Sequence, residues 1–154
     1  MIINKKELIE KAYTVFSIFR KPKQCTKHTD FEDAEFNSML LSATRRSLTI
    51  EQVGTVAWGP IPSMIPEALA YFMPRFIELA VTKTIDRDGD PFFCYFTNTF
   101  HEYSNDERYR LFGPDQKIVM ADTFDFLCQK YREQLKFEGW LDMAQQAENN
   151  WSNT

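Results

Sequence analysis

The sequence predicts an all-α protein: a single-domain bundle of about six to eight helices around one proline-interrupted central helix. Apolar side chains recur at helical spacing along most of the 154 residues, capping patterns precede several of these runs, and no segment alternates with the period of a strand. With 44% hydrophobic and 15% aromatic residues, the chain has enough material for one packed core. Residues 1–154 are therefore expected to form one helical domain.

Capping patterns mark the starts of the first two helices. Asn4-Lys5-Lys6-Glu7 is a capping box, and its helix should continue to near Arg20, before Pro22 ends the run. Thr29-Asp30-Phe31-Glu32 is a second candidate cap. The helix after it carries an apolar face formed by Phe31, Ala34, Met39, Leu40 and Ala43.

Glycine and proline divide the middle of the chain. Thr49-Ile50-Glu51-Gln52 repeats the capping pattern for a short helix that Gly54 should close, since glycine takes the backbone conformation that a helix stop commonly needs. Pro66 suits the first position of the next helix, the apolar centre of the sequence. Pro74 lacks an N–H and crowds the preceding turn, so we expect two helical pieces, 66–73 and 74–84.

Two shorter helices are expected next. Asp90 should cap a helix that has Pro91 at its first position and runs through Phe100, with aromatic rings on nearly every side. Such a helix is either central or covered by a partner. Another short helix should start at Ser104-Asn105-Asp106-Glu107 and end at Gly113.

The longest apolar run follows, with Asp115 as its expected cap. After a bend at Gly139, a terminal helix should reach Trp151. No window approaches the roughly 18 uncharged apolar residues that a membrane span requires, so no membrane association is predicted. The apolar side of the longest run comprises Ile118, Val119, Phe124, Leu127, Cys128, Tyr131 and Leu135.

The net charge of −4 is unevenly distributed. Residues 1–29 hold seven Lys and Arg against two Glu, a net charge of +5, which leaves −9 for the rest of the chain. An acidic body disfavours nucleic acid as a partner and favours a basic protein surface. The odd and widely spaced cysteines, together with the absence of a secretory signal, indicate free thiols in the cytoplasm; they are Cys25, Cys94 and Cys128.

Two patterns contain potential metal ligands. Asp86-Arg87-Asp88-Gly89-Asp90 resembles the start of a calcium loop, but Pro91 and Thr97 stand where glycine and glutamate are needed, which favours a solvated turn. A second set offers a thiolate, imidazoles and a carboxylate, and would suit a metal-dependent hydrolase; it comprises Cys25, His28, Asp30 and His101. Only Cys25 and His28 form a close pair of ligands, whereas a structural zinc site usually has two such pairs. Because both metal patterns are incomplete and no glycine-rich phosphate loop occurs, we predict neither a resident metal nor a cofactor.

Aromatic residues are in surplus between positions 92 and 112. The favoured interpretation is that they pack as core around residues 66–84, and the alternative is that they anchor an interface. A homodimer would satisfy both interpretations. Cys94 lies within this aromatic helix, where burial would raise its pKa and make it a poor nucleophile.

Five segments together resemble a family of small bacterial proteins of unknown function: Leu48-Thr49-Ile50-Glu51, Trp58-Gly59-Pro60, the run from Pro66 to Pro74, the run from Asp122 to Leu127, and Trp151. Members of that family have a Trp-x-Pro step, a Pro-Glu-x-x-x-Tyr-Tyr-x-Pro helix, a later Phe-Leu helix and a terminal tryptophan. Phe72 stands where a second tyrosine is common. The family has no assigned activity, so the resemblance implies a bacterial, cytoplasmic, helical protein and transfers no catalytic residue.

The acidic body, the aromatic surplus and the lack of a catalytic constellation predict a non-enzymatic binding protein. An immunity or antitoxin-like protein that masks a basic partner, such as a toxin domain, fits this description. The metal-dependent hydrolase is the alternative. The residues predicted to contact the partner are Asp86, Asp88, Tyr103, Asp106, Glu107 and Tyr109.

Overall fold

A computed structural model describes residues 3–27, 30–102 and 106–153. Within these residues it contains eight α-helices and two 3-10 helices, and its only β pairings are three isolated bridges. The predicted all-α class is therefore confirmed. The elements are α1 (Lys5–Val15), α2 (Phe31–Ser42), α3 (Ile50–Val53), η1 (Ile61–Ser63), α4 (Pro66–Val81), α5 (Phe92–Phe100), η2 (Glu107–Tyr109), α6 (Pro114–Lys130), α7 (Arg132–Phe137) and α8 (Leu141–Ser152).

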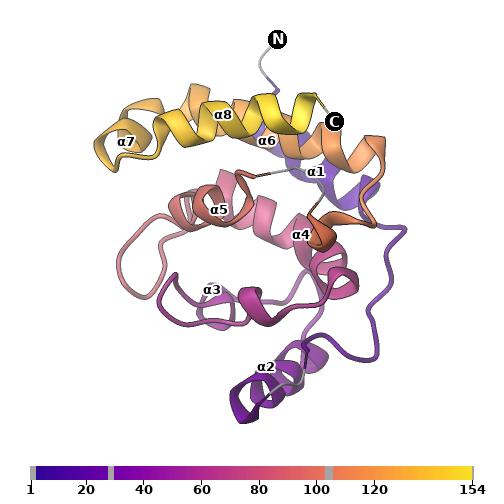
Figure 1. The fold of residues 1–154 in the computed structure, drawn as a ribbon. Coiled ribbons are helices and arrows are strands. Elements are labelled where there is room, and N and C mark those ends of the chain that lie inside the picture. Colours follow the sequence, from indigo (N-terminus) through magenta and orange to yellow (C-terminus); the bar gives the residue numbers. More distant parts are fainter. Residues whose placement is uncertain (1–2, 28–29, 103–105, 154) are drawn as a thin grey trace.

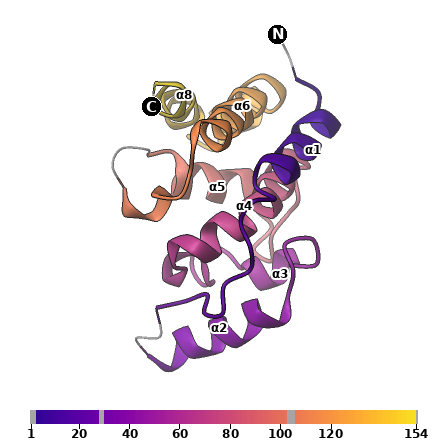
Figure 2. The same ribbon diagram turned by 90° about the vertical axis from the view of Figure 1, so that its right-hand side faces the viewer.

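Helix α4 lies at the centre of the fold and contacts α1, α5, α6 and η2. Figures 1 and 2 show α1, α6 and α8 on one side of α4 and α5, and α2 and α3 on the other. Helices α6 and α8 pack along one another. One continuous core cluster runs from Leu8 to Trp151, as expected of a single domain.

The central helix is not divided at Pro74, contrary to the prediction of two pieces. Pro74 lies inside a single helix that continues to Val81. A proline in a helix interior costs about 3 kcal/mol, whereas full burial of one large apolar side chain contributes roughly 1.5–3 kcal/mol. Several such side chains are buried on both sides of the proline, among them Phe72 and Phe76, so packing outweighs the backbone defect.

Several predicted helix starts are confirmed. The Asn4 side chain accepts a hydrogen bond from the Glu7 amide at 2.8 Å. Thr49 and Gln52 form a complete capping box at α3, and Gly54 ends that helix with a φ of 81°. Pro66 is the first residue of α4, where its missing N–H leaves no intrahelical bond unmade.

Other boundaries differ from the prediction. Helix α1 ends at Val15 instead of near Arg20. Pro91, and not Asp90, is the N-cap of α5, and Gly113, and not Asp115, is the N-cap of α6. The Asp90 carboxylate therefore does not cap α5.

The longest apolar run also divides: α6 ends at Lys130, and α7 begins after Tyr131. Ile118 is about half exposed and does not belong to the apolar face. Asp30 caps α2 by accepting from the Asp33 amide, while Thr29 lies outside the described residues. In place of the short helix expected from Ser104 to Gly113, the described residues form the 3-10 helix η2, which Asp106 caps and which ends at Tyr109.

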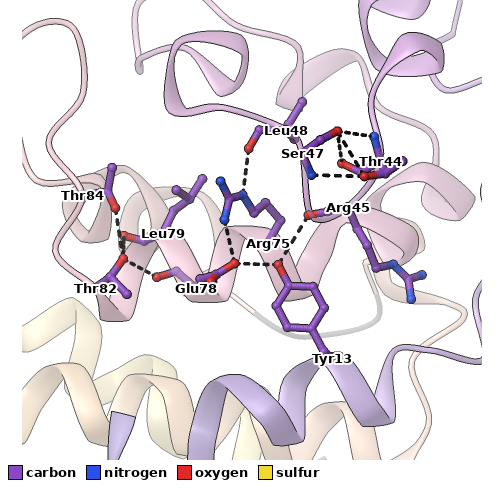
Figure 3. Close-up of polar contacts among 10 residues, drawn as sticks. All are labelled: Tyr13, Thr44, Arg45, Ser47, Leu48, Arg75, Glu78, Leu79, Thr82 and Thr84. Atoms are coloured by element: carbon purple, nitrogen blue, oxygen red, sulfur yellow. Dashed lines mark hydrogen bonds and ion pairs between the residues drawn. The ribbon is translucent and has the colours of Figure 1, made fainter. Parts of the chain in front are cut away.

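A polar network ties α1 to α4 and to the turn before α3 (Figure 3). The Tyr13 hydroxyl donates to the Glu78 carboxylate at 2.6 Å, and Arg75 donates to the same carboxylate and to the Leu48 carbonyl, both at 2.7 Å. Burial, followed by the hydrogen bond to Glu78, raises the pKa of Tyr13. Tyr13 therefore remains a neutral hydrogen-bond donor with a structural role.

Among the described residues, no helix combines the length and the apolarity that crossing a membrane would need.

Candidate functional site

The candidate site is a small hollow, here called the acidic pocket, with a volume of about 130 Å³. Its walls come from the loop after α3, the turn before α5, α5 itself and the link between α7 and α8, segments that meet on the left of Figure 1. It is lined by Thr55, Val56, Asp86, Asp90, Cys94, Tyr95, Asn98, Glu138 and Trp140. Three of these residues carry carboxylates and none is basic.

Asp86 builds the turn that forms one wall. Its carboxylate accepts from the amides of Asp88 and Asp90 at 2.9 and 3.1 Å, and its own amide donates to the Asp90 carbonyl at 2.8 Å. Gly89 completes the turn with a φ of 86°. Asp86 would be the first ligand of a calcium loop, but its carboxylate accepts hydrogen bonds from the amides of its own turn. The exposed Asp90 carboxylate makes no hydrogen bond or ion pair with any described residue.

The loop from Gly54 to Gly59 forms the opposite wall. Thr55 and Trp58 pair through their backbones, and a side chain at Gly54 would collide with the Trp58 carbonyl, so the turn depends on glycine at this close approach. The loop holds Val56 at 68% exposure and Trp58 at 43%. These two apolar side chains therefore remain on the surface in a fixed place.

The Trp58 ring is held from two sides. One face packs against Phe36 of α2, with 4.9 Å between ring centroids. The Arg87 guanidinium lies 5.8 Å from the Trp58 ring centroid, within cation–π range. Glu32, Phe36, Trp58 and the shared residues Thr55, Val56 and Tyr95 line a second hollow that adjoins the acidic pocket.

Cys94 and Tyr95, two buried residues of α5 in the lining, are here called the floor of the acidic pocket. Burial, reinforced by the negative charges of Glu138, Asp90 and Asp86, raises the pKa of the Cys94 thiol to about 12. The thiol therefore stays protonated at neutral pH, which makes it a poor nucleophile. Tyr95 is only 8% exposed, and burial raises its pKa to about 12. Its hydroxyl makes no hydrogen bond with any residue that the structure describes, although its side chain lines both hollows.

The structure separates the residues predicted to contact a partner. Asp86 and Asp88 lie on the turn beside the acidic pocket. Asp106 is the N-cap of η2 and Glu107 is its first residue, and they pair with Arg108 and Arg110 respectively. Tyr103 lies outside the described residues.

Tyr109 requires a correction, because it is buried. The residue is 2% exposed, and its ring packs against Phe100, Phe112 and Trp151. It therefore belongs to the core and has no surface to offer a partner in this conformation. The same holds for most of the aromatic surplus: the rings of Phe92, Phe93, Phe96 and Phe100 are fully buried within the chain.

Sequence reasoning missed several residues of the site, among them Val56 and Glu138. It interpreted Asp90 as a helix cap, and it considered Tyr95 only as one member of the aromatic surplus. The one local signal was that Val56 and Trp58 stand in a loop bounded by Gly54 and Gly59, since loops run over the protein surface. Glu138 carries no such signal, because only the packing of α7 and α8 brings it to the turn at Asp86.

The residues of the metal-site alternative have different neighbours. Cys25 is fully buried, with its amide bonded to the Asn37 side chain of α2, and Asp30 caps the same helix. His101 ends α5, where its carbonyl accepts from Asn150 of α8. His28 lies outside the described residues. Within the described part of the chain, no three His, Cys, Asp or Glu side chains form a group that could hold a metal ion.

Comparison with protein-family models, with curated proteins and with solved structures gives no match to this chain.

Proposed function

We propose that the chain is a non-enzymatic binding protein that covers a basic surface of a partner protein, in the manner of an immunity or antitoxin-like protein. The observation that carries the proposal is the acidic pocket, where Asp90 and Glu138 lie beside the exposed Val56 and Trp58 and form no ion pair with a residue that the structure describes. Protein interfaces combine apolar and aromatic anchors with a polar rim.

The charge of the whole chain supports a partner with a basic surface. The net charge is −4, and the basic residues concentrate before residue 30, so the rest of the molecule attracts cationic surfaces. Complementary charge of this kind increases the association rate and rejects acidic competitors. The chemistry of the pocket floor agrees, because a protonated Cys94 thiol and a neutral Tyr95 are contact groups at neutral pH and poor nucleophiles.

Capture from the native host at low ionic strength tests the proposal. The tagged wild type is compared with an Asp90→Asn/Glu138→Gln double variant, which keeps the shape of the pocket and removes two charges. A Glu133→Gln/Asp142→Asn variant is the matched control, since both residues are exposed and neither lines the pocket. We expect one stoichiometric basic protein with the wild type and the control, much less with the double variant, and weaker recovery at high salt.

Equal recovery with the double variant would show that these carboxylates take no part in binding. Recovery of no stoichiometric protein by the wild type at either salt concentration would contradict the proposed function itself.

A further inference from the structure

The acidic pocket contains acceptors that the chain leaves unused. The side chains of Asp90 and Glu138 make no hydrogen bond or ion pair with the described residues, although they face one small recess with Asp86. The Tyr95 hydroxyl, on a side chain more than nine-tenths buried, also lacks a partner in the part of the chain that the structure describes. This hydroxyl can therefore accept a hydrogen bond from an incoming donor.

The size and walls of the pocket restrict what can enter. A volume of about 130 Å³ is well below the roughly 300–1,000 Å³ of sites that hold cofactors or drug-sized ligands, so the occupant is a single side-chain terminus or a small cation. The aromatic side chains of Tyr95 and Trp140 are part of the lining. Flat cations stack well on such rings.

We propose that the acidic pocket receives one arginine side chain of the partner protein, an inference that rests on the proposed function. A guanidinium presents five N–H donors in a plane, which suits several acceptors around a narrow recess better than the compact ammonium of lysine. The carboxylates of Asp90 and Glu138 supply the charge, and the Tyr95 hydroxyl accepts at the floor. The backbone next to this arginine then lies over Val56 and Trp58.

The surroundings of the pocket favour a protein-borne arginine over a free cation. Val56 and Trp58 stand exposed at the rim, and the second hollow continues from Tyr95 toward Phe36. A small free cation would leave these apolar side chains in water, whereas a protein segment covers them while its arginine fills the pocket.

The tryptophans provide a direct assay, because the chain has three and each occupies a different environment. Trp140 lines the acidic pocket, Trp58 lines the second hollow, and the Trp151 indole donates to the Phe100 carbonyl at 2.9 Å in the core. The ¹H–¹⁵N indole signals are followed while the ¹⁵N-labelled protein is titrated with Nα-acetyl-arginine amide. We expect a saturable shift of the Trp140 signal and none of the Trp151 signal.

Three further titrants identify the chemistry. Nα-acetyl-citrulline amide has nearly the same shape without the charge and should cause no saturable shift, and Nα-acetyl-lysine amide should bind more weakly than the arginine amide. Spermidine tests whether the pocket instead binds a small cation that is free in solution. Tighter binding of spermidine than of the arginine amide would identify a polyamine site and overturn the proposal, as would equal shifts from citrulline.

Variants assign the contacts. Tyr95→Phe removes one hydroxyl and should weaken the arginine amide roughly three- to tenfold. Glu138→Gln should weaken it about two- to fivefold, and the Glu133→Gln control should leave it unchanged. Unchanged affinity in both Tyr95→Phe and Glu138→Gln, in proteins whose other backbone signals match the wild type, would overturn the assignment.

The two proposals fail separately. Capture that depends on Asp90 and Glu138, combined with no response to the arginine amide, would leave the binding function standing and reject the arginine. Saturable arginine binding without any captured protein would reject the binding function and the partner-borne arginine with it, and would leave only a pocket that binds a guanidinium.

Discussion

Replacing Phe96 with alanine tests whether the aromatic residues around α5 are the core of the fold. Phe96 is fully buried, and its ring lies 5.0 and 5.4 Å from those of Phe100 and Phe124, centroid to centroid. Truncating a buried phenylalanine costs about 3–5 kcal/mol, the sum of lost transfer free energy and the cavity left behind. At roughly 0.05–0.15 kcal/mol per residue, this is a large part of the total stability of a chain of this length.

Phe137 is the matched control for Phe96→Ala. It has the same side chain at 87% exposure, so Phe137→Ala should change the free energy of unfolding by no more than about 0.5 kcal/mol. Urea unfolding followed by far-UV circular dichroism measures both variants. A loss below about 1 kcal/mol for Phe96→Ala, or equal losses for the two, would refute the assignment of these rings to the core.

Two further predictions concern the loop at the site and the packing of α6 against α8. Gly54→Ala should lower the midpoint of thermal unfolding more than Gly89→Ala does. Both glycines have positive φ, but only at Gly54 would the added Cβ collide with backbone atoms. Similar losses in the two variants would show that the collision is relieved at little cost. Burial, followed by the charges of Asp125 and Asp122, raises the pKa of Glu148. Ionised Glu148 therefore destabilises the native state at neutral pH, and Glu148→Gln should raise the unfolding midpoint at pH 7. That gain should shrink as the pH falls through the raised folded-state pKa and vanish below the ordinary glutamate value of about 4.3, whereas a gain independent of pH would exclude the electrostatic cause.

The fold was predictable where the signal is local. The caps at Asn4 and Thr49 and the first position of α4 at Pro66 depend on residues within one turn of each other, and each occurs as the sequence indicates. Pro74 was misjudged because its local cost is outweighed by packing from elements distant in sequence. Tyr109 was assigned to the surface because the number of neighbouring aromatics does not indicate how many rings one core can enclose.

The site was only partly predictable. The acidic turn was identified, but its leading carboxylate, Asp86, satisfies backbone amides, and the available charge belongs to Asp90 and Glu138. Their proximity depends on how the link between α7 and α8 packs against the turn before α5. No periodicity or spacing in the sequence encodes that arrangement, so a site made of three separate segments emerges only from the fold.

The guanidinium of Arg87 over Trp58 has a consequence for the strength of any complex. The free protein already gives its most exposed indole a cation of its own. A ligand that stacks on this ring exchanges one contact for another instead of gaining a new one. Arg87 therefore competes with any ligand for the Trp58 ring and limits the affinity at the second hollow. In the free protein the same guanidinium covers part of an indole that would otherwise be exposed to water.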